Sequence, residues 1–158
     1  MNKKNIFLIF GIILLTGISF FVIANPETLI ITVSDVNTTV LSQNVEVPVL
    51  LENNATVYGI QLSISHHPYL IFDNISLTSR MENMTVEFND VDNKILIASV
   101  GGDGIQAGNG TIFNLVFDLS ALALGDYALN STDILAANID TELYNTEFNL
   151  GTLHVGAI

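Results

Sequence analysis

The sequence predicts an all-β domain, a β-sandwich of about nine antiparallel strands with jelly-roll topology, preceded by an apolar N-terminal signal or anchor helix. Three observations predict the sandwich. Beyond residue 24 the chain consists of short runs rich in Ile, Val, Leu, Phe and Thr. Asn, Asp, Gly and Pro separate these runs at intervals of about ten residues, as in sandwiches and barrels. No segment shows a convincing helical period, since even the stretch 119–124 is followed by Gly125 and is better explained as a loop.

Each run is justified by its side chains. In 59–65, Ile60, Leu62 and Ile64 alternate with small or polar residues, which is typical of a strand with one buried face. The run 94–100 is apolar on both faces, so it is either covered by its own protein or part of a partner surface. The polar stretch 90–94 predicts a hairpin turn before it. The expected strands are 28–34, 45–51, 58–65, 70–77, 85–88, 94–100, 111–119, 127–130 and 150–155.

The N-terminal segment reads as a secretory signal. Lys3 and Lys4 precede an unbroken apolar stretch that ends at Ala24, and we expect cleavage after this small residue. An uncleaved membrane anchor is the alternative, because the apolar stretch approaches the length that spans a bilayer. Either way residues 25–158 are expected to be secreted or on the extracellular face of the cell envelope.

Residues 25–158 have the size of a single domain with one core. The chain has no cysteine, so this core must be stable without disulfides. Arg80 and Lys94 are the only basic residues after position 24, against sixteen acidic ones, for a net charge of −14. Such a surface excludes nucleic-acid binding, and membrane contact is expected only through the N-terminal segment.

No motif points to catalysis or to a cofactor. The histidines His66 and His67 are adjacent and would project to opposite faces of a strand, so a transition-metal site is not expected. The glycine-rich run 101–110 lacks the Lys-Ser or Lys-Thr ending of a phosphate loop. Asp90, Asp92 and Asp103 do not have the spacing of a calcium loop. There is also no Gly-x-Ser-x-Gly elbow and no zinc-binding helix, and we expect a protein that is not an enzyme.

Six Asn-x-Ser/Thr sequons follow the signal. In a eukaryotic or archaeal secretory pathway they would accept glycans at the surface, whereas in most bacteria they reflect only composition. The candidate sites are Asn37, Asn54, Asn74, Asn83, Asn109 and Asn130.

Several runs, taken in order, resemble the cohesin domain, an extracellular β-sandwich. Val45-Glu-Val-Pro-Val49 is similar to the family's second strand, and Gly59 to Pro68 is similar to its strand that ends in Tyr-Asp-Pro. The hairpin 92–98, the entry Gly108-Asn-Gly-Thr111 into a long apolar strand, the segment 132–138 and the closing run 151–156 also match. The resemblance covers roughly residues 28–156.

The resemblance implies a non-catalytic module that docks a partner protein, such as a calcium-loaded dockerin-like module, through one sheet face. The partner-binding positions it implies are Gly59, Gln61, Ser63, Leu96, Ala98 and Val100. Two features depart from the family: His66 and His67 replace its Tyr-Asp, and Gln61 stands where dockerin-binding members often have an acidic residue. A carbohydrate-binding module that takes polysaccharide and a structural or adhesion subunit of the cell envelope remain open as alternatives.

Overall fold

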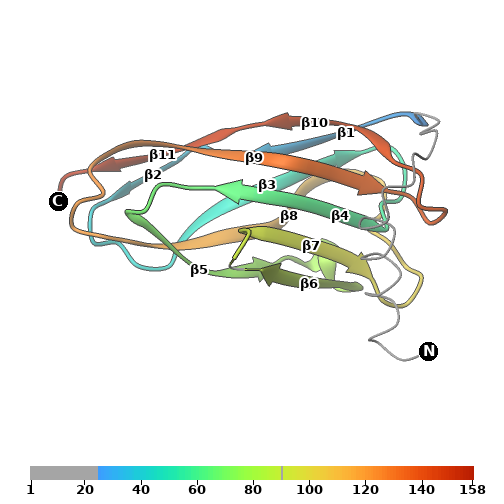
Figure 1. Ribbon diagram of the computed structural model, residues 1–158, viewed down its shortest axis with the longest axis horizontal. Helices are drawn as coiled ribbons and strands as arrows, with labels where there is room; N and C mark the ends of the chain where they lie inside the picture. Colours follow the sequence, from blue (N-terminus) through green and yellow to red (C-terminus); the bar gives the residue numbers. More distant parts are fainter. Residues whose placement is uncertain (1–24, 90) are drawn as a thin grey trace.

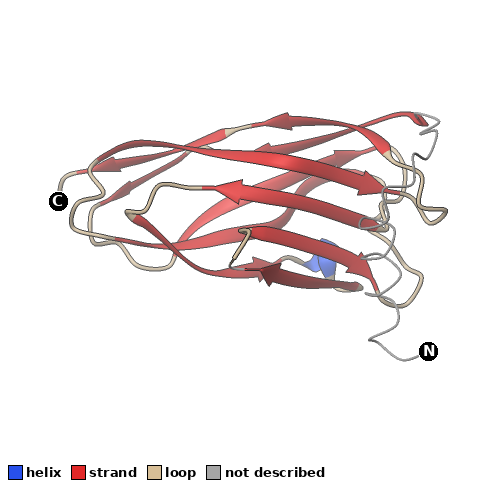
Figure 2. Cartoon of the chain, in the orientation of Figure 1, coloured by secondary structure: helices blue, strands red, loops and turns tan. Residues whose placement is uncertain are grey.

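The computed structural model of the chain describes residues 25–89 and 91–158, so the signal-peptide prediction lies outside the described residues. Strands make up most of the described chain, with one short 3₁₀ turn (Figure 2). No helix in the described part of the chain is long and apolar enough to cross a membrane. The elements are β1 (Asn25–Val33), β2 (Val36–Thr39), β3 (Val45–Asn53), β4 (Gly59–Ser65), β5 (Leu70–Leu77), η1 (Ser79–Met81), β6 (Met84–Asn89), β7 (Lys94–Ser99), β8 (Gly108–Leu119), β9 (Gly125–Ala137), β10 (Tyr144–Asn149) and β11 (Gly151–Gly156).

The strands form two stacked sheets, which confirms the predicted β-sandwich (Figure 1). The five-stranded sheet has the order β10-β1-β3-β8-β5, and the six-stranded sheet has the order β2-β11-β9-β4-β7-β6. Most neighbours are antiparallel, but β1 pairs with β10 and β2 pairs with β11 in parallel. The expectation of a purely antiparallel sandwich is therefore wrong at these two pairs, where the N-terminal strands meet the C-terminal ones.

The chain changes sheets between β1 and β2 and again between β10 and β11, at the same side of the sandwich. The carboxylate of Asp35, in the first crossing, accepts a hydrogen bond of 2.8 Å from the backbone N–H of Thr152 in β11. Gly151 packs directly against the first crossing, because a Cβ there would lie 2.5 Å from the carbonyl oxygen of Val33. The two crossings thus hold each other in place.

The core lies between the inner faces of the two sheets and follows the period-two alternation of the strands. In β4 the predicted core residues Ile60, Leu62 and Ile64 are all buried. In β7, Ile95 and Ile97 point inward and are fully buried. The largest fully buried side chains are Phe113 and Phe117 of β8, opposite this pair of strands.

Eleven strands are present among the described residues where nine were expected. The expected hairpin of 85–88 with 94–100 is confirmed as β6 and β7. Two strands were missed, β2 and β10, and β9 continues seven residues past the predicted end at 130. The segment 120–124 is a loop, as expected.

Candidate functional site

The outer face of the six-stranded sheet brings the predicted partner-binding residues together. The register places β4 between β7 and β9, and β6 lies beyond β7. Residues paired across neighbouring strands point to the same side, so the outward side chains form rows across four strands. We call these three rows the four-strand face: Thr85–Ala98–Gly59–Ala137, Glu87–Leu96–Gln61–Leu135 and Asn89–Lys94–Ser63–Thr132.

Five of the six predicted residues lie within these rows. Gly59 pairs with Ala98, Gln61 pairs with Leu96, and Ser63 occupies the third row. The sixth, Val100, follows the end of β7 and is 44% exposed beside the first row. The residues predicted from separate segments of the sequence thus form one continuous surface.

The first row is flat because its side chains are small. Ala98 is only 6% exposed and Gly59 is also buried, although both belong to the outward side of the sheet. Leu96 in the second row is half-buried. The apolar face of β7 that carries Leu96 and Ala98 points outward, and its own neighbours cover it in part.

Gln61 lies at the centre of the second row, between Leu96 and Leu135. Gln61 as a whole is 8% exposed. Its side-chain amide has no hydrogen-bond partner among the described residues. Every fully buried side-chain nitrogen or oxygen atom in those residues does have a partner. The amide therefore keeps contact with solvent at the surface of the face. This solvated amide, between two leucine side chains, is free to donate to and accept from a docked molecule.

Sequence reasoning missed the flanks of the four-strand face. Leu135 and Ala137 come from the part of β9 that was not expected to be a strand, and Thr85 and Glu87 come from the edge strand β6. The run Ile134-Leu-Ala-Ala137 carried an apolar signal on both faces, like β7, and could have identified β9 as a second strand of this surface.

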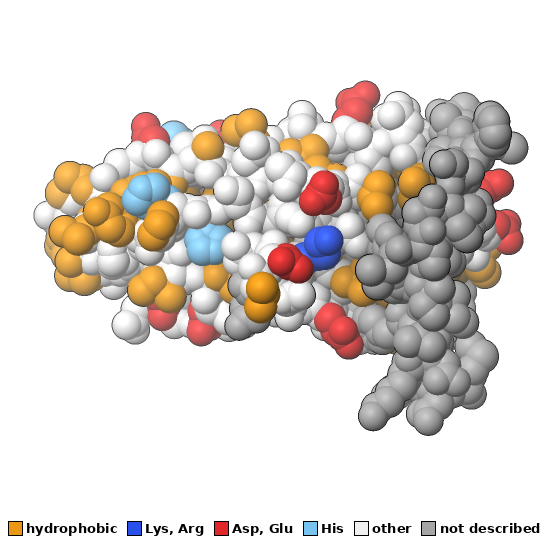
Figure 3. Space-filling view, in the orientation of Figure 1, with side chains coloured by type: hydrophobic (Ala, Val, Ile, Leu, Met, Phe, Trp, Pro, Cys, Tyr) orange, Lys and Arg blue, Asp and Glu red, His pale blue; other side chains and the backbone are white. Residues whose placement is uncertain are grey.

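The four-strand face is nearly uncharged in a very acidic protein. Its only charged side chains are Lys94 and Glu87, which lie in adjacent rows on neighbouring strands. Figure 3 shows the same face, where two acidic groups lie beside the one basic group and uncharged groups cover much of the rest. A mixture of Leu, Ala, Ser, Thr and Gln fits a protein partner better than a highly charged ligand.

A second surface feature lies at the end of the sandwich where the loops 40–44, 66–69 and 120–124 meet. Backbone hydrogen bonds join them, from Leu119 N–H to the Ser42 carbonyl and from Ser120 N–H to the Tyr69 carbonyl. The ring of His67 lies 4.7 Å from Tyr69 and 5.0 Å from Tyr127, measured between ring centroids. We call these three residues the tip aromatic cluster.

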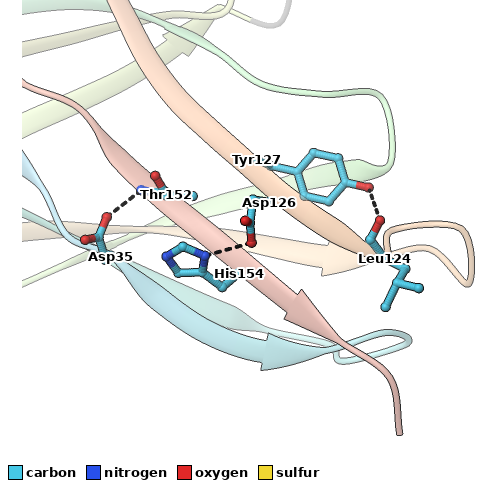
Figure 4. Close-up of polar contacts among 6 residues, drawn as sticks. All are labelled: Asp35, Leu124, Asp126, Tyr127, Thr152 and His154. Atoms are coloured by element: carbon cyan, nitrogen blue, oxygen red, sulfur yellow. Dashed lines mark hydrogen bonds and ion pairs between the residues drawn. The ribbon is translucent and has the colours of Figure 1, made fainter.

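The surroundings of the tip aromatic cluster are both apolar and polar. Exposed Leu122 and Leu124 belong to the adjoining loop. The hydroxyl of Tyr127 donates a 3.3 Å hydrogen bond to the Leu124 carbonyl, and the next residue, Asp126, contacts the ring of His154 at 2.8 Å (Figure 4). The sequence did not suggest this cluster, because Tyr127 is far along the chain from His67 and Tyr69.

The two adjacent histidines point apart, although they lie in the loop after β4 and not on a strand. The ring of His66 packs on Phe72 and Phe117, whereas His67 belongs to the exposed tip aromatic cluster. Across residues 25–89 and 91–158, no group of three or more His, Asp and Glu side chains is arranged to hold a metal ion. Asp90 lies outside the described residues.

The sequence matches no protein-family model and no curated protein. Solved structures do match. A non-cellulosomal cohesin from the archaeon Archaeoglobus fulgidus is 21% identical, with a TM-score of 0.69 over 82% of this chain and 91% of that chain. A cohesin from Clostridium thermocellum, solved as a type I cohesin–dockerin complex, is 14% identical, with a TM-score of 0.72 over 85% and 97%.

A third match is a cohesin from Clostridium acetobutylicum, which is 19% identical, with a TM-score of 0.66 over 83% of this chain and 92% of that chain. At these identities the likeness establishes the fold alone. The chain therefore has a cohesin-like fold, as its sequence motifs predicted.

Proposed function

We propose that this cohesin-like domain is a non-catalytic extracellular module whose four-strand face docks a protein partner of dockerin type. The observation that carries the proposal is the Gln61 amide, which is surrounded by Leu96 and Leu135 and has no partner within the described protein. Such an amide contributes little to the stability of the free domain. It can form hydrogen bonds with a docked molecule, which would shield these bonds from water.

Two further observations support docking. The flat first row, built from Gly59, Ala98 and Ala137, lets another backbone or helix approach the sheet closely. Two of the three comparison proteins are of clostridial origin, and one was solved with a dockerin bound. The extracellular location rests on the signal-like N-terminal segment.

A binding experiment tests the proposal. Residues 25–158 contain every strand of the sandwich, and they would be used to capture proteins from the secreted and envelope fractions of the source organism, with calcium and with a chelator. The expected result is calcium-dependent capture of a protein that carries a dockerin-like repeat, since calcium would be needed to fold such a partner.

Variants make this test specific for the four-strand face. Leu96→Asp and Ala98→Asp place a charge on the face and are expected to abolish capture without loss of the folded state. Ile71→Asp is the matched control, because Ile71 is exposed on β5 in the other sheet. Equal loss of capture with Ile71→Asp, or undiminished capture with Leu96→Asp, would contradict docking at this face.

Carbohydrate binding is a second candidate, and the tip aromatic cluster favours it. Aromatic rings at a surface can stack on the apolar face of a sugar, and His67 and Tyr69 are exposed. Retention of residues 25–158 on polysaccharide, lost on Tyr69→Ala and kept on Leu96→Asp, would favour this function over protein docking.

Self-assembly through an edge strand has weaker support. The edge strand β2 has only four residues, and the other three edges, β5, β6 and β10, carry the exposed carboxylates of Asp73, Glu87 and Glu147. Short and charged edges oppose the addition of strands from another chain. A structural or adhesion role would therefore have to use another surface.

A further inference from the structure

The sequons are more frequent than the composition of the chain explains. Residues 25–158 contain 15 asparagines and 21 serines and threonines among 134 residues, so random order would give 15 × 21/134, or about two, sequons. The chain has six. Five of them end in threonine, and the remaining one, at Asn74, ends in serine.

The structure makes all six acceptor side chains accessible. Asn37, Asn54, Asn74, Asn83, Asn109 and Asn130 are all exposed. Of the eight other asparagines whose side chains are described, only Asn44, Asn89, Asn145 and Asn149 are exposed.

The asparagines inside and outside the sequons also differ in the hydrogen bonds of their side-chain nitrogen, Nδ2. Outside the sequons, Asn53, Asn114, Asn138 and Asn149 use Nδ2 to donate hydrogen bonds to other parts of the protein. Within the sequons only Asn74 does so, to the neighbouring Asp73 carboxylate. The Nδ2 atoms of the five Asn-x-Thr sequons donate no hydrogen bond to the described residues, so a substituent on them would break none of the contacts that hold this fold.

None of these five residues belongs to the four-strand face, although Asn83 and Asn130 lie two residues from its Thr85 and Thr132. Asn130 pairs with Ser65 on the same side of the sheet, roughly 13 Å along β4 from Gln61. Asn37 pairs with His154 near the far edge, on β2. Asn83 lies in the loop just before β6, and Asn54 and Asn109 belong to the ends of β3 and β8 in the other sheet. No sequon asparagine falls within the three rows.

We propose that the chain is N-glycosylated at Asn37, Asn54, Asn83, Asn109 and Asn130. The donor is an oligosaccharide linked through phosphate or pyrophosphate to a lipid. A bond forms between Nδ2 and the sugar C1 as the bond from C1 to the phosphate oxygen breaks. The electron pair of the broken bond leaves with the lipid phosphate, and Nδ2 loses one proton. This proposal does not depend on dockerin binding.

The test is mass spectrometry of the full protein purified from the cells that make it. Peptides that carry the five asparagines are expected to show added hexose or hexosamine masses. Peptides with the exposed asparagines outside sequons, Asn89 and Asn145, are expected to be unmodified. An intact mass equal to that of the unmodified polypeptide, processed or not, would overturn the proposal.

Matched variants assign the modification to the sequon. Thr39→Ala removes the acceptor sequence while keeping Asn37, and it is expected to lower the mass by one glycan. Thr39→Ser keeps the sequon and is expected to keep the glycan. Asn145→Gln is the control for a change at an asparagine outside a sequon. If Thr39→Ala leaves the mass increment on Asn37 in place, the modification is not sequon-dependent N-glycosylation.

Discussion

At the scale of single residues, Arg80 holds three segments together, and it has no acidic partner in the part of the chain that the structure describes. Its Nη1 atom donates to the carbonyls of Leu51 and Gly110 at 2.8 and 3.0 Å, and its Nη2 atom donates to the Asn53 side chain and the Gln106 carbonyl at 2.9 and 3.0 Å. Burial lowers the pKa of the guanidinium, but such a group stays charged at neutral pH.

Removal of this side chain tests its role in stability. Arg80→Ala leaves several partly buried acceptors unpaired, so we expect the free energy of unfolding to fall by about 2–4 kcal/mol. Arg80→Lys restores the charge but not the planar fork, and we expect it to recover less than half of the loss. Urea unfolding of the three proteins measures both values, and wild-type stability of Arg80→Ala would contradict this role.

Gln61 is the residue that best separates docking from folding. Gln61→Leu keeps the size of the side chain and adds apolar contact with its leucine neighbours, so the stability of the free domain is expected to be unchanged or higher. Affinity for a docked partner is expected to fall by a factor of about ten to one hundred, because the partner groups lose their hydrogen bonds. Calorimetric titration compares the affinities, and unchanged affinity would argue against the amide as a contact.

Tyr144 makes stability depend on pH at the alkaline end. Burial raises the pKa of its hydroxyl, with additional repulsion from Glu27, and the hydroxyl donates a 2.9 Å hydrogen bond to the Thr56 carbonyl. The folded protein therefore holds this proton more tightly than the unfolded chain, so the stability present below pH 10 is lost as the pH rises through the folded pKa.

Tyr144→Phe removes this titration together with the hydrogen bond. We expect the variant to be less stable at neutral pH and to lose less stability than the wild type between pH 9 and pH 11 (about one pH unit on either side of the pKa of free tyrosine). Denaturant unfolding across this range gives the free energy of unfolding as a function of pH for both proteins. Equal slopes for the variant and the wild type would show that Tyr144 is not the group responsible.

At the scale of elements, the sheet crossings depend on close backbone contact at Gly151. A Cβ at this position would lie 2.5 Å from the Val33 carbonyl oxygen and 2.6 Å from that of Ser34, so backbone atoms would have to move. Gly151→Ala is expected to destabilise the fold by about 2–3 kcal/mol through this overpacking. Gly156→Ala is the control, since the nearest atom there is 3.7 Å away, and equal losses for the two variants in thermal unfolding would contradict the argument.

At the scale of the whole molecule, the C-terminal strand closes the six-stranded sheet. β11 pairs with both β2 and β9, and its side chains Leu153 and Val155 are buried. A chain that ends at Asn149 would leave β2 without a neighbour and expose core residues such as Leu129, so we expect it to lose cooperative unfolding. A chain that ends at Gly156 lacks only two exposed residues and is expected to unfold as the full protein does. Near-ultraviolet circular dichroism during heating measures the cooperativity of unfolding of the two shortened chains.

The sequence was enough to predict the fold class, the core of β4 and β7 and the β6–β7 hairpin, because buried faces impose a period of two on side chains that are neighbours in sequence. It did not reveal β2, whose four residues are too few to show a period, and the signal in β10 from Tyr144, Thr146 and Phe148 was overlooked. Both are edge strands, held in parallel pairs by segments more than one hundred residues away.

Only the tertiary structure decided which surfaces these strands create. Register brings Leu135 of β9 and Glu87 of β6 beside the predicted Gln61 and Leu96, and loop packing brings Tyr69 to Tyr127 through His67. The fold also leaves the Gln61 amide without a hydrogen-bond partner among the described residues, whereas the buried Asn53 side chain bonds both to backbone carbonyls and to Arg80. Such contacts join residues distant in sequence, and the local pattern of a strand fixes which way a side chain points but not what it meets.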